Sequence, residues 1–164
     1  IGLLVHKSYD WGQRVGDMRM LQWDKLDLQG CRLDLTQSKR NAQVHLPIGD
    51  SLCAMLRQQK EDFGELSDYV APRTRARAGR YSPYDASEIS PLVNEVLDVA
   101  DLPRELCAMD LRRTAVTEMM EGSVDIAGIM QVTGHKNVAS LKPYMVNTFN
   151  GANKALAARG NDDE

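Results

Sequence analysis

The 164-residue sequence lacks most features that mark specialised classes of protein. Its three cysteines, Cys31, Cys53 and Cys107, have no CxxC spacing, which argues against a zinc site and favours a reducing compartment. No glycine-rich phosphate loop is present, so we expect no nucleotide site. The apolar start IGLLV is too short to span a membrane and lacks the charged segment of a signal peptide. We therefore expect a cytoplasmic protein without metal, cofactor, nucleotide or membrane partner.

An excess of positive charge is also missing, because the net charge is −3 at pH 7, which counts against a nucleic-acid partner. The charge is unevenly distributed, however. Residues 1–80 carry 13 basic and 10 acidic side chains, whereas residues 81–164 carry 7 and 13. The stretch RTRARAGR contains Arg73, Arg75, Arg77 and Arg80 and no acid. Composition leaves open whether it is a solvated loop or a strip that contacts phosphates.

An initiator methionine is missing as well, and Ile1 leads directly into an apolar run. We therefore expect residues 1–164 to be one domain of a longer protein whose N-terminal partner domain has been removed. The length is sufficient for a single hydrophobic core. The contents of 43% apolar and 26% charged residues are typical of soluble globular proteins.

The sequence periodicity is mostly helical, with one run of short strands. Alternating apolar residues predict strands at about 24–28, 31–37 and 43–48, with Val44, Leu46 and Ile48 facing inward and His45 facing outward. An arginine-rich loop is expected at 72–84. Helices are expected at 1–9, 14–22, 51–63, 85–100, 109–121, 125–132, 137–142 and 148–158. The predicted fold class is α+β, mainly α-helical with a small three-stranded antiparallel sheet.

One arginine falls on the wrong face of its predicted helix. At about 100° per residue, Arg112 lies in the arc made by Leu111, Ala115 and Met119, whereas Arg113 lies on the polar side. Arginine does not lose its proton in proteins, so burying it without an anion is costly. The ordinary explanation is an internal salt bridge to a carboxylate, and the functional one is a bidentate phosphate clamp.

A second inward arginine is predicted near the N-terminus. Arg14, Met18 and Leu21 stand at i, i+4 and i+7, which is one face of a helix. Asp17, three positions after Arg14, lies close enough to orient it or a neighbouring group. Two inward arginines from distant segments would suit two oxygens of a single phosphodiester.

Three further side chains have both an ordinary and a functional interpretation. His135 follows Gly134 between two helices, where a histidine usually serves packing or lies on the surface. Tyr144 follows Pro143, where the backbone is irregular and a hydroxyl can project, although most such tyrosines are half-buried core residues. Lys39 lies at a hairpin tip, where lysines usually aid solubility but can also enter a groove.

Four segments together resemble the tyrosine recombinases, the phage integrase family. They are GQRVGDMRMLQWDKLDL, LTQSKRNAQVHLPI, MDLRRTAVTEMM and VTGHKNVASLKPYM. The order of the segments and the spacing of the last two match the family, and together they cover most of the chain. The positions that match the family's active-site residues are Arg14, Asp17, Lys39, Arg112, His135 and Tyr144.

The resemblance implies a catalytic-domain fold and a mechanism. Tyr144 would attack a DNA phosphodiester to give a 3′-phosphotyrosine and a free 5′-hydroxyl. Arg14 and Arg112 would stabilise the transition state, Lys39 would protonate the leaving oxygen, and His135 would assist proton transfer. Because one ester replaces another, rejoining would need neither metal nor nucleotide.

The resemblance also implies double-stranded DNA as the partner, bound by a homo-oligomer, expected to be a tetramer. Further DNA contacts are expected from Arg40 and the arginines of residues 73–80. The missing N-terminal domain would bind DNA too. Residues 147–164 would form a C-terminal helix and tail that contacts a neighbouring protomer or packs on its own domain. The protein would be encoded by a bacterium or a phage and would associate with the nucleoid. Its expected use is the integration of a phage or another mobile element into DNA.

One position departs from the family pattern. Met109 stands where most members have a histidine, and a thioether neither donates a hydrogen bond nor carries a proton. Losing a transition-state donor costs about 10²- to 10³-fold in rate, so we expect a slower or compensated enzyme. Two alternatives remain open: a type IB topoisomerase-like enzyme that relaxes DNA, and a non-catalytic DNA-binding module that retains the fold.

Overall fold

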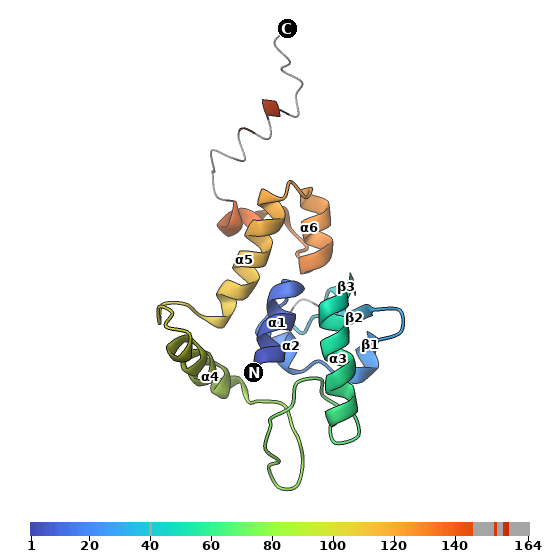
Figure 1. The fold of residues 1–164 in the computed structure, drawn as a ribbon. Helices are drawn as coiled ribbons and strands as arrows, with labels where there is room; N and C mark the ends of the chain where they lie inside the picture. Colours follow the sequence, from blue (N-terminus) through green and yellow to red (C-terminus); the bar gives the residue numbers. More distant parts are fainter. Residues whose placement is uncertain (40, 146–152, 154–155, 158–164) are drawn as a thin grey trace.

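The computed structural model describes residues 1–39, 41–145, 153 and 156–157 (Figure 1). Its helices are α1 (Gly2–Asp10), α2 (Val15–Arg19), α3 (Asp50–Phe63), α4 (Ala86–Val99), α5 (Ala108–Glu121) and α6 (Ile126–Thr133). The strands are β1 (Leu26–Asp27), β2 (Arg32–Thr36) and β3 (Gln43–Pro47), and two 3-10 helices are η1 (Trp23–Lys25) and η2 (Val138–Tyr144). The predicted α+β class, mainly helical with one small antiparallel sheet, is confirmed.

The sheet has the strand order β1-β2-β3, with antiparallel pairing throughout. Strands β2 and β3 alternate between exposed and buried residues, and Leu33 pairs with Leu46 in the register. Val44 and Leu46 are buried, as predicted, while His45 is exposed and contacts Asp34. The alternation buries one face of the sheet and leaves the other in solvent. The β2–β3 turn therefore projects from a rigid base.

Two apolar clusters make up the core. The larger cluster joins α1, α2, the sheet, α3 and the start of α4, and it includes Leu4, Met18 and Leu33. The smaller cluster joins α5, α6 and η2 around Val116, Ile129 and Leu141. Helix α1 packs against α5 and thus connects the two clusters (Figure 1). Of the predicted catalytic residues, Tyr144 packs against the smaller cluster.

Several element boundaries differ from the sequence-based expectation. Helix α2 begins after Arg14, which has an extended backbone (φ −68°, ψ 136°) and precedes the first helical residue. The helix predicted at 137–142 is a 3-10 helix that reaches Tyr144, with Pro143 inside it. Proline has no N–H for an α-helical hydrogen bond. Helix α4 continues through Pro91, and the predicted helix at 148–158 lies mostly outside the described residues.

Candidate active site

Arg112 is the largest fully buried side chain of the described residues, at 2% exposure, as its place on the helix predicted. Its Nη1 donates to the carbonyl of Gly12 at 2.8 Å, and its Nη2 donates to the carbonyl of Thr133 at 2.8 Å. Among the described residues, no carboxylate forms an ion pair with it. The internal salt bridge considered from the sequence is therefore not what holds this arginine.

Gly12, in the α1–α2 loop, provides the carbonyl that accepts from the Arg112 guanidinium. Its φ of +55° lies in the left-handed region that favours glycine. A β-carbon there would meet the Met119 side chain at 3.4 Å and Ala115 at 3.5 Å. Space alone does not require glycine here, but the left-handed backbone favours it, and in that conformation the Gly12 carbonyl accepts from Arg112.

Arg14 lies near the same guanidinium. Its Nη1 donates to Oε1 of Gln37 at 3.1 Å, and its side chain is 19% exposed. Burial, together with the neighbouring positive charge of Arg14, lowers the pKa of Arg112 to about 10. Tyr144 and Asp17 act in the opposite direction on that pKa. Arg112 still stays protonated at neutral pH, so two positive charges face one region, an arrangement that favours an anion.

Asp17 lies beside Arg14, as the sequence suggested, and also binds the β2–β3 turn. It lies 3.8 Å from Nη1 of Arg14, but its Oδ1 accepts from the backbone N–H of Ser38 at 2.9 Å and from the Ser38 hydroxyl at 2.6 Å. Its other oxygen, Oδ2, is buried without a hydrogen-bond partner in the described part of the chain. Asp17 therefore ties helix α2 to the β2–β3 turn, next to Lys39.

Lys39 is exposed on the β2–β3 turn. It makes no hydrogen bond or ion pair with another described residue. Arg40, which the sequence suggested as a DNA contact, lies outside the described residues. The Asp17–Ser38 contacts fix the base of the turn and leave the Lys39 ammonium group directed to solvent, where a bound molecule could meet it.

His135 is buried at 7% exposure, directly after the left-handed Gly134 (φ +68°) that ends α6. Its Nε2 lies 3.3 Å from Nη2 of Arg112, and its Nδ1 lies 2.6 Å from the Thr133 hydroxyl. An arginine only donates, so Nε2 must be the acceptor and the proton is on Nδ1. The Thr133 hydroxyl oxygen accepts a hydrogen bond from the Nδ1–H group of His135. The same hydroxyl donates to the Ile129 carbonyl at 2.6 Å. These contacts suit the tautomer with the proton on Nδ1 and Nε2 as acceptor.

Tyr144 is half-buried at the end of η2. Its ring lies 5.9 Å from the His135 ring, with 58° between the ring planes. The buried Leu141 side chain holds η2 against α5 and α6. Because Tyr144 also raises the pKa of Arg112 through its hydroxyl, the phenol and the guanidinium are direct neighbours. The structure thus brings Arg14, Arg112, His135 and Tyr144 together, with Lys39 on the adjacent turn.

Two buried glutamines were not identified from the sequence. Nε2 of Gln37 donates to Oε1 of Gln13 at 2.6 Å and to the Thr133 carbonyl at 2.8 Å. Nε2 of Gln13 donates to the Val132 carbonyl at 2.6 Å. The two amides join the α1–α2 loop, strand β2 and the end of α6. The sequence contained one indication of their role, which is that Gln13 directly precedes the predicted site residue Arg14.

The arginine-rich loop is not part of this cluster. It protrudes at the end of the molecule opposite to α6 and η2 (Figure 1). Arg73 forms ion pairs with Asp85 at 2.9 Å and with Glu88, and its side chain is 12% exposed. Arg75, Arg77 and Arg80 are exposed, and Arg77 lies 3.5 Å from Asp85. Arg73 therefore holds the start of α4, and DNA contact by the loop stays a prediction.

Met109 is 49% exposed, one turn before Arg112 on α5. Its thioether is therefore not part of the buried arginine's hydrogen-bond shell. No group of three or more potential metal ligands (His, Cys, Asp or Glu) occurs among the described residues. Within the same residues, no helix has the length and apolar character needed to cross a membrane.

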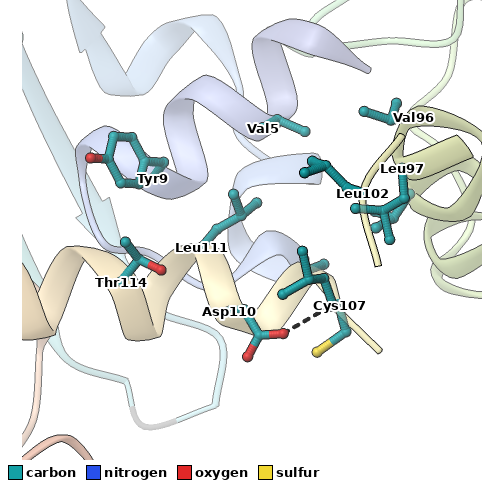
Figure 2. A pocket seen from close by; sticks show the side chains of 12 residues that line it. Val5, Tyr9, Val96, Leu97, Leu102, Cys107, Asp110, Leu111 and Thr114 are labelled. Atoms are coloured by element: carbon teal, nitrogen blue, oxygen red, sulfur yellow. Dashed lines mark hydrogen bonds between the residues drawn. The ribbon is translucent and has the colours of Figure 1, made fainter. Parts of the chain in front are cut away.

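An apolar cavity of about 300 Å³ lies elsewhere, between α1, α4 and α5 (Figure 2). Val5, Leu97 and Leu111 line it, and the Asp110 carboxylate at its edge accepts from the backbone N–H of Cys107 at 2.8 Å. None of the predicted catalytic residues lines this cavity. The predicted catalytic residues therefore lie apart from this cavity.

Comparisons with known proteins agree with this picture. Residues 3–150 match the sequence profile of the phage integrase family. The tyrosine recombinase XerC of Xanthomonas axonopodis pv. citri is 26% identical over 142 residues, covering 86% of this chain and 45% of that protein. XerC of Mycobacterium bovis is 27% identical over 146 residues, with 87% and 48% covered. The chain spans about half the length of these relatives.

Solved structures share the fold. The crystal structure of XerA recombinase superposes with a TM-score of 0.72 at 18% identity, covering 97% of this chain and 61% of that chain. A lambda integrase dimer bound to a COC′ core site gives a TM-score of 0.69 at 20% identity, covering 99% and 43%. The fold is that of tyrosine recombinase catalytic domains, and the profile match extends over nearly the whole chain, so this protein belongs to the phage integrase family.

Proposed function

We propose that this chain is the catalytic domain of a site-specific DNA recombinase that cuts and rejoins double-stranded DNA through a 3′-phosphotyrosine intermediate. The observation that carries the proposal is a buried arginine without a carboxylate partner, next to a second arginine, a histidine and a tyrosine. A phosphodiester supplies the ion-pair partner that Arg112 lacks. The relatives that match in sequence are named tyrosine recombinases.

The Tyr144 oxygen is the proposed nucleophile. It attacks the phosphorus, the bond to the 5′-oxygen breaks, and the DNA is left attached through a phosphotyrosine. The Arg14 and Arg112 guanidinium groups hold the non-bridging oxygens as negative charge grows on them. The 5′-hydroxyl of a second strand reverses the step, and no phosphate ester is lost overall.

Lys39 and His135 are the proposed proton carriers. Lys39, on the exposed β2–β3 turn, protonates the departing 5′-oxygen when DNA covers the turn. Nε2 of His135 accepts from Arg112. A phosphate oxygen competes for the same guanidinium N–H, and Nε2 is then the imidazole atom that exchanges a proton with the reacting oxygens.

The finer features of the recombinase are part of the same proposal. We expect a tetramer on two DNA sites, with residues 147–164 contacting the neighbouring protomer, and action on bacterial or phage DNA in the cytoplasm. Arg40, Arg75, Arg77 and Arg80 would add contacts to the DNA backbone. The topoisomerase-like and non-catalytic alternatives have less support, because the matching relatives are recombinases.

The decisive experiment is covalent trapping on nicked suicide duplexes with a randomised core, using the protein in its native full length. The wild type should form a complex that survives SDS, and sequencing its DNA identifies the preferred site. Tyr144→Phe should abolish the complex, because it removes only the attacking oxygen. Tyr81→Phe is the matched control, since Tyr81 contacts Phe63 by its ring edge, away from the cluster.

Persistence of the complex in Tyr144→Phe would refute Tyr144 as the nucleophile. Plasmids that carry the recovered DNA site then distinguish recombination from relaxation. Two copies on one plasmid should yield recombinant products at a rate that depends on both copies. Relaxation of a plasmid with one copy, without recombination when two are present, would favour the topoisomerase-like alternative.

A further inference from the structure

Two cysteines that appear unrelated in the sequence meet in the fold, far from the tyrosine. Cys31 lies in the turn between β1 and β2, and Cys53 lies in the first turn of α3. Both thiols are directed to one backbone carbonyl, that of Leu28, with Sγ to oxygen distances of 3.9 and 3.7 Å. Burial, followed by the hydrogen bond to the adjacent Cys31 thiol, raises the pKa of Cys53. The two sulfur atoms are therefore direct neighbours.

The two thiols have different surroundings. Cys53 is 1% exposed, whereas Cys31 is half-buried and reachable from solvent. Nη2 of Arg57 donates to Sγ of Cys31 at 3.5 Å and to the Leu28 carbonyl at 2.8 Å. Arg57 thus places a hydrogen-bond donor beside the Cys31 sulfur, which is the sulfur that solvent reaches. Cys31 is thus suited to react first, and Cys53 is suited to resolve the product.

The backbone holds Cys31 in this place at some cost. Its φ of +48° lies in the left-handed region, which residues with a β-carbon rarely adopt. Oδ1 of Asp27 accepts from the N–H of Gly30 at 2.8 Å, and the Cys31 carbonyl accepts from the N–H of Ile48 at 2.8 Å. These contacts on both sides of the residue fix the Cα–Cβ direction and keep the sulfur next to Cys53.

We propose that Cys31 and Cys53 form an oxidation site that hydrogen peroxide or another hydroperoxide converts into a reversible intramolecular disulfide. The Cys31 thiolate attacks one peroxide oxygen, the O–O bond breaks, and a sulfenic acid and one water form. The Cys53 sulfur then attacks the Cys31 sulfur, the S–O bond breaks, and a second water leaves. Overall, two thiols lose two electrons and two hydrogens, and one peroxide is reduced to two waters. A thiol reductant reverses the change.

A metal site is a poorer use of the same pair. Arg57 places a positive charge at the Cys31 sulfur and repels a cation. In the part of the chain that the structure describes, no third His, Cys, Asp or Glu completes a ligand set with the two thiols. The cluster therefore favours an electrophilic oxidant over a metal ion.

Peroxide treatment followed by alkylation and mass spectrometry tests the site in the wild-type protein. Residues 1–164 of the reduced protein should take up three alkyl groups, one for each of their cysteines. After oxidation these residues should lose about 2 Da and retain only Cys107 for alkylation. Peptide mapping should identify a Cys31–Cys53 link that dithiothreitol removes. Faster oxidation at the exposed Cys107, or a disulfide that includes it, would overturn the proposal.

Variants separate the roles of the two sulfurs. Cys53→Ser should stop the reaction at a Cys31 sulfenic acid that dimedone traps, and Cys107→Ser should leave the disulfide yield unchanged. Arg57→Gln should slow oxidation about fivefold or more. Lys60→Gln is its matched control, because Lys60 lies on the same helix but contacts Trp23. Loss of the disulfide in Cys107→Ser, or equal slowing by both helix variants, would contradict the assigned order.

Discussion

Two regions of the molecule hold an arginine away from solvent, and they do so by different means. In the cluster at the end of α6, Arg112 is bonded to the carbonyls of Gly12 and Thr133 and to the imidazole of His135. At the start of α4, Arg73 is bonded to the carboxylates of Asp85 and Glu88. In both side chains Nη1 and Nη2 donate hydrogen bonds. Only Arg73 has its charge neutralised.

The difference indicates which arginine is available for a ligand. A carboxylate pair already satisfies Arg73, so a phosphate would have to displace it. Carbonyl groups solvate Arg112 without cancelling its charge, and Arg14 adds a second positive charge nearby. The helical periodicity predicted that Arg112 points inward, but an inward arginine alone does not indicate a function. The argument for function comes from its partners, which are carbonyl groups and not carboxylates.

The largest expected effect distinguishes the two arginines directly. Arg112→Lys keeps the charge but removes the fork that binds two oxygens, so covalent complex formation on the trapped DNA site should fall about 10²- to 10³-fold. Arg73→Lys should change the rate less than twofold while lowering the unfolding free energy by about 1 kcal/mol. Rates come from single-turnover trapping, and stability comes from urea denaturation.

Cooperative unfolding of Arg112→Lys is the necessary control, because its partners Gly12 and Thr133 belong to different segments. An equal fall in both arginine variants would remove the distinction between the regions. It would also mean that the loop at residues 73–80 contributes to the reaction as strongly as the buried cluster.

A third buried cation sharpens the comparison, because lysine can lose its proton. Lys7 is fully buried in the larger cluster, and its Nζ donates to the Met18 carbonyl at 3.1 Å. Burial lowers its pKa from 10.5 to about 7. Above pH 7 the unfolded chain therefore binds more protons than the folded protein, and the unfolding free energy should rise between pH 7 and 10.5.

The rise attributable to Lys7 should be a few kcal/mol. Lys7→Met should abolish it and stabilise the protein most at or below pH 7, where the wild type must bury a charge or release a proton. Urea denaturation of both proteins at pH 6.5, 8 and 9.5 measures the difference, and other titrating groups cancel in it. Parallel pH profiles would show that Lys7 does not titrate in this range.

The sequence predicted the parts of the site that follow from periodicity and local motifs. The helical periodicity of α5 predicted that Arg112 is buried, and the alternation in β3 predicted that Val44 and Leu46 face inward. The combined family segments predicted the fold. Amide pairing of Gln13 with Gln37 was not predictable, because it depends on how two distant segments meet. The Cys31–Cys53 contact was missed for the same reason.

Element ends were predicted less well where backbone chemistry overrides periodicity. Arg14 shares the spacing of Met18 and Leu21, yet it precedes α2 in an extended conformation. That conformation directs its side chain across to Gln37, which directly follows β2. The segment before Tyr144, which contains Pro143, is similarly a 3-10 helix and not an α-helix. In both cases the irregular backbone lies beside a predicted catalytic residue.

A smaller effect is expected from the relay behind His135. Thr133→Val keeps the shape but removes the hydroxyl that accepts from Nδ1. The imidazole then loses the bond that selects its tautomer, and the trapping rate should fall about tenfold with DNA affinity unchanged. Thr114→Val, on an exposed face of α5, is the control. An unchanged rate in Thr133→Val would mean that Arg112 alone orients His135.

The smallest effect is expected at Met109, which lies on the same helix as Arg112 but outside its hydrogen-bond shell. Because Met109 is 49% exposed, Met109→His should fold normally, and it adds a donor one turn before the arginine. The trapping rate should stay the same or rise. A tenfold fall would mean that the thioether has a packing role with DNA or a protomer. A rise would indicate that the buried cluster of carbonyls and imidazole sustains the reaction without that donor, though below its full rate.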